Sequence, residues 1–310
     1  MKFDFDKDIP DLSGKTILVT GGNVGLGKET IYQLSKHKPA HIYLAARNAT
    51  SAQDAIEDIQ QRAPGAAPIT FIECDLTSFA SIKRAAANFL SQASELHILI
   101  NNAGIMACPP GQTQEGYEIQ FGTNHMGHAQ LTKLLLPTLL ATAEKGGAGT
   151  DVRIVSLSSL GEAFAAKDPY ADADTRLKSD LASTSTWTRY GIAKLANVHH
   201  SRALAQRYPS IRCVAVHPGT VNTELTRGPL ASYSAFSFIM KPLNWLVSFG
   251  LTDVSEGAKN QVWAAVSPDA ESGHFYHPVA VDGKASAQAK DEKLCEQLWA
   301  WTEKELEAHK

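Results

Sequence analysis

The sequence predicts an α/β protein in which a doubly wound parallel sheet of about seven strands carries helices on both faces. Short apolar runs alternate with longer segments of helical periodicity, which is typical of strand–helix–strand units. These runs are largely apolar along their length rather than at every second residue, as expected of strands covered on both sides. Six runs are the candidate strands, at residues 16–19, 42–46, 69–72, 98–100, 153–157 and 213–216.

The segments between the candidate strands are long enough for crossover helices, each expected to be right-handed. Their starts are predicted near Gly25, Ser51, Ser78, Glu115 and Trp187. A serine side chain can accept a hydrogen bond from the first turn of a helix, so Ser51 and Ser78 are the predicted N-caps.

A single domain is predicted for residues 1–310, because the chain shows no internal repeat, no low-complexity tract and no composition shift. A hydrophobic content of 44% is enough to fill one large core. Three parts depart from the strand–helix alternation. They are an irregular insertion at 161–188, an apolar lobe at 222–253 and a C-terminal helix at 285–310.

Neither nucleic acid nor a metal is an expected partner. The 29 basic residues are balanced by 32 acidic ones, and no long basic run offers a surface for phosphates. The histidines at 125, 128, 199 and 200 form close pairs without a third ligand at metal spacing. The four cysteines form no Cys-x-x-Cys pair, which argues against a zinc site or a disulfide framework and favours a reducing compartment.

A cytoplasmic location is expected. Acidic residues stand near the N-terminus where a secretory signal would need an uninterrupted apolar core. The apolar stretch 233–251 is broken by Lys241 and Pro242, so no transmembrane span is predicted. Contact with a membrane interface stays open for this stretch, as do a substrate lid, an oligomer contact and simple core packing.

A glycine-rich turn follows the first candidate strand, where residues 20–27 read TGGNVGLG. Glycines let the backbone approach a pyrophosphate, and the N-terminus of the following helix offers free N–H groups and partial positive charge. The spacing resembles the T-G-x-x-x-G-x-G turn of classical short-chain dehydrogenases/reductases, which implies a Rossmann fold. The resemblance implies cofactor contacts from Gly21, Asn23, Val24, Gly25, Leu26 and Gly27.

The end of the second strand indicates which dinucleotide is bound. An NAD-specific fold commonly places an acid here for the adenosine ribose, but the position is Ala46. Arg47 follows it and can pair with the 2'-phosphate of NADP(H), which is therefore the expected cofactor. The alternative is that Arg47 is only a solvated arginine at a strand end.

Two further strand ends match the same family. The resemblance implies that Asp75 and the backbone of Leu76 contact adenine, although Asp75 could instead cap the next helix. Residues 101–104 read NNAG, a family motif that steadies the sheet and flanks the cofactor. Its contacts would come from Asn102, Ala103 and Gly104.

The candidate catalytic pair is Tyr190 and Lys194, which stand one helical turn apart on one face. A nearby ammonium favours the phenolate, so Lys194 is expected to lower the pKa of Tyr190. By itself this spacing is common on exposed helices. Two serines that end the strand at 153–157 supply the context, and the family's pattern favours Ser159 over Ser158 as the catalytic serine.

Two more segments complete the resemblance, which runs from about residue 14 to 223. Asn124 matches the family asparagine that holds a water in the proton relay. Residues 217–223 resemble the segment that folds over the nicotinamide, with contacts from Pro218, Gly219, Val221 and Thr223. The dinucleotide-binding half then covers mainly 14–150 and the catalytic half 151–223, and the motifs are most similar to the retinol-dehydrogenase-like group.

The resemblance implies an NADP(H)-dependent oxidoreductase, such as a carbonyl reductase, that moves a hydride between nicotinamide and a carbonyl or alcohol of an apolar small molecule. The alternatives are a redox-sensing regulator that binds NADP(H) without catalysis, and an isomerase or dehydratase that uses the nicotinamide transiently. Family habit suggests a homodimer or homotetramer. Ser159 and Tyr190 are 31 positions apart, more than usual, and a looped-out insertion would reshape the substrate pocket while leaving the catalytic residues in place.

Overall fold

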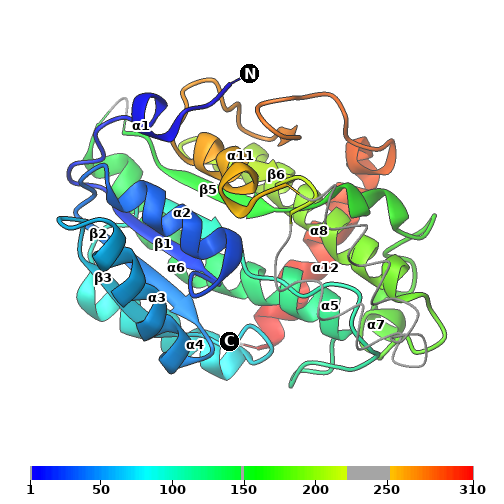
Figure 1. Cartoon of the computed structure of the whole chain (residues 1–310). Coiled ribbons are helices and arrows are strands. Elements are labelled where there is room, and N and C mark those ends of the chain that lie inside the picture. Colours follow the sequence, from blue (N-terminus) through cyan, green and yellow to red (C-terminus); the bar gives the residue numbers. More distant parts are fainter. Residues whose placement is uncertain (1, 148–149, 222–251, 310) are drawn as a thin grey trace, which may run out of the picture.

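The computed structural model describes residues 2–147, 150–221 and 252–309 and shows a parallel sheet between two layers of helices (Figure 1). The strand order is β3-β2-β1-β4-β5-β6-β7, with every neighbouring pair parallel. The strands are β1 Thr16–Thr20, β2 His41–Ala46, β3 Ile69–Glu73, β4 Ile98–Asn101, β5 Arg153–Leu157, β6 Arg212–Val216 and β7 Phe275–Tyr276. The predicted doubly wound sheet is confirmed, and its order reverses between β1 and β4, where such folds bind ligands.

The helices connect and cover these strands. They are α1 Phe5–Asp8, α2 Gly25–Ser35, α3 Ala49–Arg62, α4 Phe79–Gln92, α5 Ile119–Phe121, η1 Gly122–Met126, α6 Gly127–Lys145, η2 Leu160–Phe164, α7 Ala173–Arg176, α8 Thr186–Arg207, α11 Val254–Val266, η5 Gln288–Lys290 and α12 Glu292–Ala308. Of these, η1 is a single π-helical segment that runs into α6, whereas η2 and η5 are 3₁₀ turns.

Some predicted helix starts need correction. Ser78 does cap α4, accepting a hydrogen bond from the backbone of Ser81. The cap of α3 is Asn48 rather than Ser51, because the Asn48 side chain accepts from the Ser51 N–H and the helix has already begun at Ala49. The helix expected near Glu115 begins at Ile119, and the C-terminal helix is shorter than 285–310.

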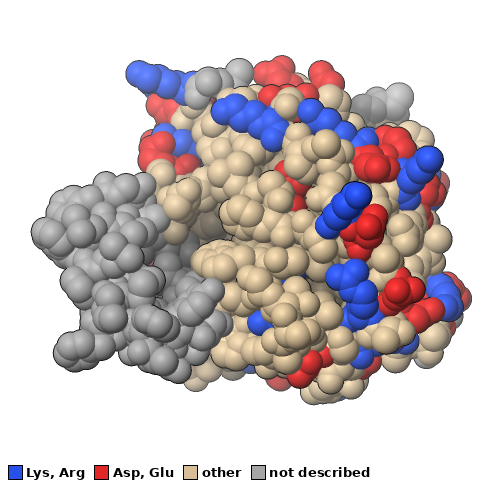
Figure 2. Space-filling view, turned by 90° about the vertical axis from the view of Figure 1, so that its right-hand side faces the viewer, with Lys and Arg blue, Asp and Glu red and all other residues tan. Residues whose placement is uncertain are grey.

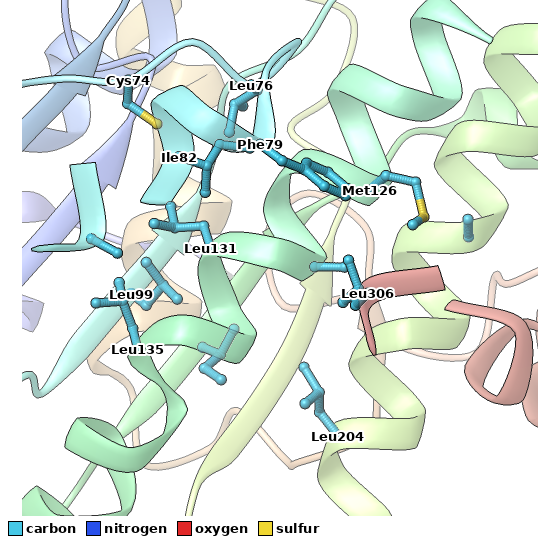
Figure 3. Packing of buried hydrophobic residues seen from close by; sticks show 14 of the residues in the cluster. Cys74, Leu76, Phe79, Ile82, Leu99, Met126, Leu131, Leu135, Leu204 and Leu306 are labelled. Carbon is cyan, nitrogen blue, oxygen red and sulfur yellow. The ribbon is translucent and has the colours of Figure 1, made fainter. Parts of the chain in front are cut away.

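Two apolar cores lie on the two faces of the sheet. Side chains from α2, α3 and α11 form one core, and side chains from α4, α6, α8 and α12 form the other. Successive residues of β1 serve both, since Ile17 and Val19 face the first and Leu18 the second. Figure 3 shows part of the second core, where Leu131 of α6 and Leu306 of α12 lie in the same cluster.

The insertion before α8 is packed and is not looped out. A Cβ added at Gly161 would lie 2.8 Å from Cε1 of Tyr190, and one added at Gly191 would lie 2.5 Å from the backbone nitrogen of Ala165. The Glu162 carboxylate accepts hydrogen bonds from the backbone and hydroxyl of Ser286, at 2.9 and 2.6 Å. The insertion therefore forms part of the wall around the N-terminal half of α8.

Within the described ranges, none of the helices combines the length and the apolar character needed to cross a membrane. The same residues contain no group of three or more histidine, cysteine or acidic side chains placed to hold a metal ion. The apolar lobe proposed at 222–253 lies almost wholly outside the described residues.

The packing of α12 gives a stability prediction. Leu298 is buried in the core shared with α6 and α8, so Leu298→Ala should lower the free energy of unfolding by about 2–5 kcal/mol in urea titrations. Lys293→Ala, at an exposed position of the same helix, should change it by less than about 0.5 kcal/mol. Equal unfolding midpoints for both variants would show that α12 is not part of the core.

Candidate active site

The glycine turn between β1 and α2 is closely packed and depends on its glycines. Gly21 has φ +65°, and a Cβ at Gly27 would lie 2.3 Å from the carbonyl oxygen of Gly21, so a larger residue there would force the turn apart. The N-cap of α2 is Val24, whose side chain cannot accept a hydrogen bond from the first turn. Backbone N–H groups at this helix start are thus available to an anion.

The end of β4 is tied to the end of β1 by three hydrogen bonds. The Thr20 hydroxyl accepts from the backbone N–H groups of Asn102 and Ala103, both at 3.0 Å. The Asn102 side-chain amide donates to the Thr20 carbonyl at 2.7 Å. Gly104 follows, and a Cβ there would lie 3.1 Å from Oδ1 of Asn124 and 3.5 Å from Nζ of Lys194. The NNAG segment therefore lies between the glycine turn and the candidate catalytic residues.

Both polar atoms of the Asn124 side chain are hydrogen-bonded to one backbone residue. Its Oδ1 accepts from the N–H of Ile105 at 2.8 Å, and its Nδ2 donates to the carbonyl of Ile105 at 2.9 Å. Asn124 lies in the π-helical segment η1, and such segments often mark functional positions. A water can bind this residue at its backbone carbonyl or at the second hydrogen-bonding position of either side-chain atom.

Three candidate catalytic residues lie together at the carboxyl end of β5. Tyr190 and Lys194 are buried on α8, with Nζ of Lys194 5.7 Å from the centre of the Tyr190 ring. The Ser159 hydroxyl interacts with the Tyr190 phenol and acts to lower the pKa of that phenol. The Ser158 hydroxyl points elsewhere and donates to the Lys194 carbonyl at 2.7 Å. Of the two serines, the one whose hydroxyl faces the phenol is Ser159.

The electrostatics of the pair differ from the sequence-based expectation. Burial raises the pKa of Tyr190 to about 12 despite the hydrogen bond from Ser159, and burial lowers the pKa of Lys194 to about 8. The expected lowering of the Tyr190 pKa by Lys194 is therefore wrong for the protein chain by itself. The Lys194 ammonium donates instead to the carbonyl of Leu157 at 3.0 Å.

Sequence reasoning missed Asn197, which supports Lys194. Its Nδ2 donates at 2.9 Å to the same Leu157 carbonyl that Lys194 contacts. The signal was present, because residue 197 follows residue 194 by three positions and shares its helix face. His128 was also missed, having been weighed only as a metal ligand.

The residues expected around adenosine lie at neighbouring strand ends. Arg47 is exposed at the end of β2, and no acidic side chain in the described ranges forms an ion pair with it. Asp75 uses Oδ1 to accept from the N–H and hydroxyl of Thr77, at 2.9 and 2.8 Å, so it closes a local turn. The Leu76 side chain is buried in the core, close to Phe79 (Figure 3). Only the backbone of Leu76 is left for a ligand.

The segment expected over the nicotinamide is described only in part. Pro218 and Gly219 follow β6, with Gly219 at φ +92°. Val221 pairs with Thr252 in an isolated parallel bridge, so these two described residues lie side by side. Thr223 falls outside the described residues.

Apolar side chains surround the approach to Tyr190. Leu160 and Phe164 of η2 are exposed by 51% and 56%. The rings of Phe164 and Trp187, and those of Trp187 and Tyr190, meet edge to face with centroids 6.4 Å apart. Figure 2 views the molecule from the side on which α7 lies, and uncharged residues cover most of that face.

Comparison with known proteins decides the family. Residues 15–172 match the family model described as short chain dehydrogenase. The chain belongs to the short-chain dehydrogenase/reductase family. A short-chain dehydrogenase/reductase of Armillaria gallica is 37% identical over 96% of this chain and 91% of the relative. Retinol dehydrogenase 12 of Mus musculus and retinol dehydrogenase 11 of Homo sapiens are each 34% identical over 93% of this chain, covering 85% and 84% of those proteins, and place it in the retinol-dehydrogenase-like group.

Solved structures share the fold of this short-chain dehydrogenase/reductase. A protein of Mycobacterium paratuberculosis superposes with a TM-score of 0.71 at 25% identity, covering 99% of this chain and 98% of the other. The NADPH-bound carbonyl reductase from chicken fatty liver has a TM-score of 0.62 at 24% identity, covering 87% and 99%. The chain is thus a member of an oxidoreductase family with the family's sheet and helices in place.

The buried lysine predicts a pH-dependent stability. Because the pKa of Lys194 is lowered from 10.5 to about 8 by folding, its charged form destabilises the folded protein at pH 7, by up to about 3 kcal/mol. Lys194→Met should therefore raise the free energy of unfolding at pH 7, since Asn197 still satisfies the Leu157 carbonyl. The advantage should shrink between pH 8 and pH 10.5, where the folded wild type loses its proton before the unfolded chain does.

Urea titrations at pH 7 and pH 10 would measure this change. Lys293→Met, at an exposed position, is the matched control and should shift stability by less than about 0.5 kcal/mol at either pH. A Lys194→Met protein that is less stable than the wild type at pH 7 would contradict the assignment of a desolvated ammonium.

Proposed function

We propose that this protein is an NADP(H)-dependent oxidoreductase that interconverts a carbonyl and an alcohol on an apolar small molecule. One observation carries the proposal: Ser159, Tyr190 and Lys194 meet at the carboxyl edge of the sheet, across the NNAG segment from the phosphate-binding turn. That arrangement brings a proton donor next to the place where a bound nicotinamide would reach.

The residues around the turn fit the cofactor. Glycines at residues 21–27 let the backbone approach a pyrophosphate, and a Cβ at Gly27 would collide with the Gly21 carbonyl and disturb the turn. The exposed guanidinium of Arg47 suits the 2'-phosphate, because it can contact two phosphate oxygens at once. The backbones of Asp75 and Leu76, the NNAG segment and residues 218–223 would complete the binding surface.

Bound NADPH would supply a hydride to the carbonyl carbon of the substrate. Tyr190 donates a proton to the carbonyl oxygen, and Ser159 donates a hydrogen bond that orients and polarises the same oxygen. The raised pKa of Tyr190 keeps the phenol protonated at neutral pH, as reduction requires. Alcohol oxidation follows the same steps in reverse, with Tyr190 accepting the proton.

Lys194 and Asn124 would return a proton to Tyr190. The Lys194 ammonium would hold the nicotinamide ribose hydroxyls and pass a proton toward the phenol. The Asn124 amide already pairs with Ile105, and we place the relay water at the Asn124 backbone carbonyl, to which it would donate a hydrogen bond. The pKa of Lys194, about 8, is low enough for proton exchange near neutral pH.

The proposal of an apolar substrate is supported by apolar side chains next to Ser159 and Tyr190. Leu160 follows Ser159 directly, and Phe164 and Trp187 lead in edge-to-face contact to the Tyr190 ring. Their exposed apolar area would be removed from water by a substrate of matching character.

Tyr190→Phe should abolish turnover while preserving NADPH binding. Loss of the general acid is expected to lower kcat by about 100-fold to 10,000-fold, measured as NADPH absorbance decay over a panel of apolar aldehydes, ketones and quinones. NADPH fluorescence titration should give an unchanged Kd. Full activity in the variant would refute the mechanism. Tight NADPH binding by a wild-type protein that shows no turnover would favour a redox-sensing regulator. Product formed without net consumption of NADPH would favour an isomerase or dehydratase.

Arg47→Ala should change the cofactor preference. Removing a guanidinium that pairs with the 2'-phosphate should raise KM for NADPH by about 10-fold to 100-fold and leave KM for NADH unchanged. Arg84→Ala, at an exposed arginine of α4, is the control and should alter neither. Equal effects of Arg47→Ala on both cofactors would remove the case for NADP(H).

A further inference from the structure

His128 lies at the centre of the polar contacts between the glycine turn and Asn124. It is the second residue of α6 and is 4% exposed. Its Nδ1 is 2.9 Å from the Asn124 backbone oxygen, and its Nε2 is 2.9 Å from the Thr20 hydroxyl. Both ring nitrogens are therefore engaged, each by a different part of the site.

The partners of His128 determine which nitrogen carries the proton. The Asn124 carbonyl can only accept, so Nδ1 must be the N–H donor. The Thr20 hydroxyl already accepts from the N–H groups of Asn102 and Ala103, so its own proton is free to be donated. Two acceptors lie within reach of the Thr20 hydroxyl: Nε2 of His128 at 2.9 Å and the carbonyl oxygen of Ile100 at 3.4 Å. The nearer one is Nε2.

The imidazole is kept neutral by its surroundings. Burial lowers the pKa of His128 to about 4, and the nearby charge of Lys194 acts in the same direction. A neutral ring has one donor and one acceptor, which is the combination that the two partners need. An imidazolium would leave the Thr20 proton facing a second proton.

We propose that His128 is a positioning residue that fixes the backbone carbonyl of the relay residue Asn124 relative to the Thr20 turn that holds the cofactor. This inference rests on the proposed function, because it assigns His128 to the reaction described above. The Nδ1 bond holds the Asn124 carbonyl in place, and with it the direction from which a relay water would donate to that oxygen. The Nε2 bond fixes the hydroxyl that receives the NNAG backbone.

Two isosteric variants separate the two bonds. Asn places its amide N–H where Nδ1 lies and cannot reach Thr20, whereas Gln reaches Thr20 with a carbonyl oxygen and leaves Asn124 unpaired. His128→Gln should lower kcat by about tenfold with the NADPH Kd within about twofold of wild type. His128→Asn should raise the NADPH Kd by about tenfold, with a smaller fall in kcat at saturating NADPH.

His125→Gln is the matched control. His125 is also a buried histidine, three residues earlier, but its Nε2 contacts the Thr302 hydroxyl of α12, and its side chain is hydrogen-bonded to neither Thr20 nor the Asn124 carbonyl. It should lower the melting temperature while leaving the ratio of kcat to NADPH Kd close to that of wild type. A purely structural His128 would behave in the same way, with no difference between its Asn and Gln variants.

NADPH fluorescence titration, steady-state kinetics with the carbonyl compound that the wild type reduces fastest, and thermal melts provide the three readings. A fall mainly in kcat for His128→Gln, together with a rise mainly in the NADPH Kd for His128→Asn, would support the proposal. The same pattern in both variants, or no change in either, would overturn it. If the wild type reduces no compound, the proposed function fails first. The NADPH Kd still tests the role of His128 in that case. An unchanged Kd in a folded His128→Asn protein would overturn the proposal that His128 holds the Thr20 turn.

Discussion

Strands β1 and β4 lie side by side, yet the chain leaves them toward opposite faces of the sheet. After β1 it enters α2 on one face, and after β4 it runs to α5 and α6 on the other. The hydrogen bonds between the two strands end where the strands end, so another interaction must set the distance between the segments that follow β1 and β4. The Thr20 hydroxyl supplies it by receiving two backbone N–H groups of the NNAG segment. This contact joins the glycine turn to the NNAG segment, which in turn lies next to the candidate catalytic residues.

Helix α8, which carries the candidate residues Tyr190 and Lys194, is enclosed by its neighbours. Residues 189–201 of α8 are buried without interruption, which is unusual for a helix that flanks a sheet. The insertion closes on it at Gly161 and Gly191, where only hydrogen fits, and α12 closes on it where the ring of Trp299 stacks on His200. Tyr190 therefore has little freedom to leave the geometry that proton transfer needs.

The sequence was most informative where chemistry depends on local spacing. Six strands, the glycine turn and the one-turn separation of Tyr190 and Lys194 follow from periodicity and neighbouring residues alone. The two-residue strand β7 is too short to carry a periodic signal. The α3 cap was misplaced because Asn48 and Ser51 both suit a cap and only backbone geometry selects between them. The contacts of His128 and the packing of the insertion join residues that are distant in the chain.

The pKa of Tyr190 was misjudged for a related reason. Spacing shows that an ammonium is near the phenol, but it does not show how completely water is excluded, and here burial has the larger effect. The same limit applies to Ser158 and Ser159, which are adjacent in the chain. Their hydroxyls have different partners, because that of Ser158 donates to a helix carbonyl and that of Ser159 interacts with the phenol.

The position of α12 also bears on how the chain reaches this structure. Its apolar face completes the core on α6 and α8, but synthesis delivers it only after β6, α11 and β7. Until it emerges, the side chains that Cys295, Leu298 and Leu306 later cover are exposed to water on a nascent domain whose sheet can already be assembled. The growing polypeptide therefore exposes an apolar surface during translation until α12 covers it, and chaperones bind surfaces of this kind.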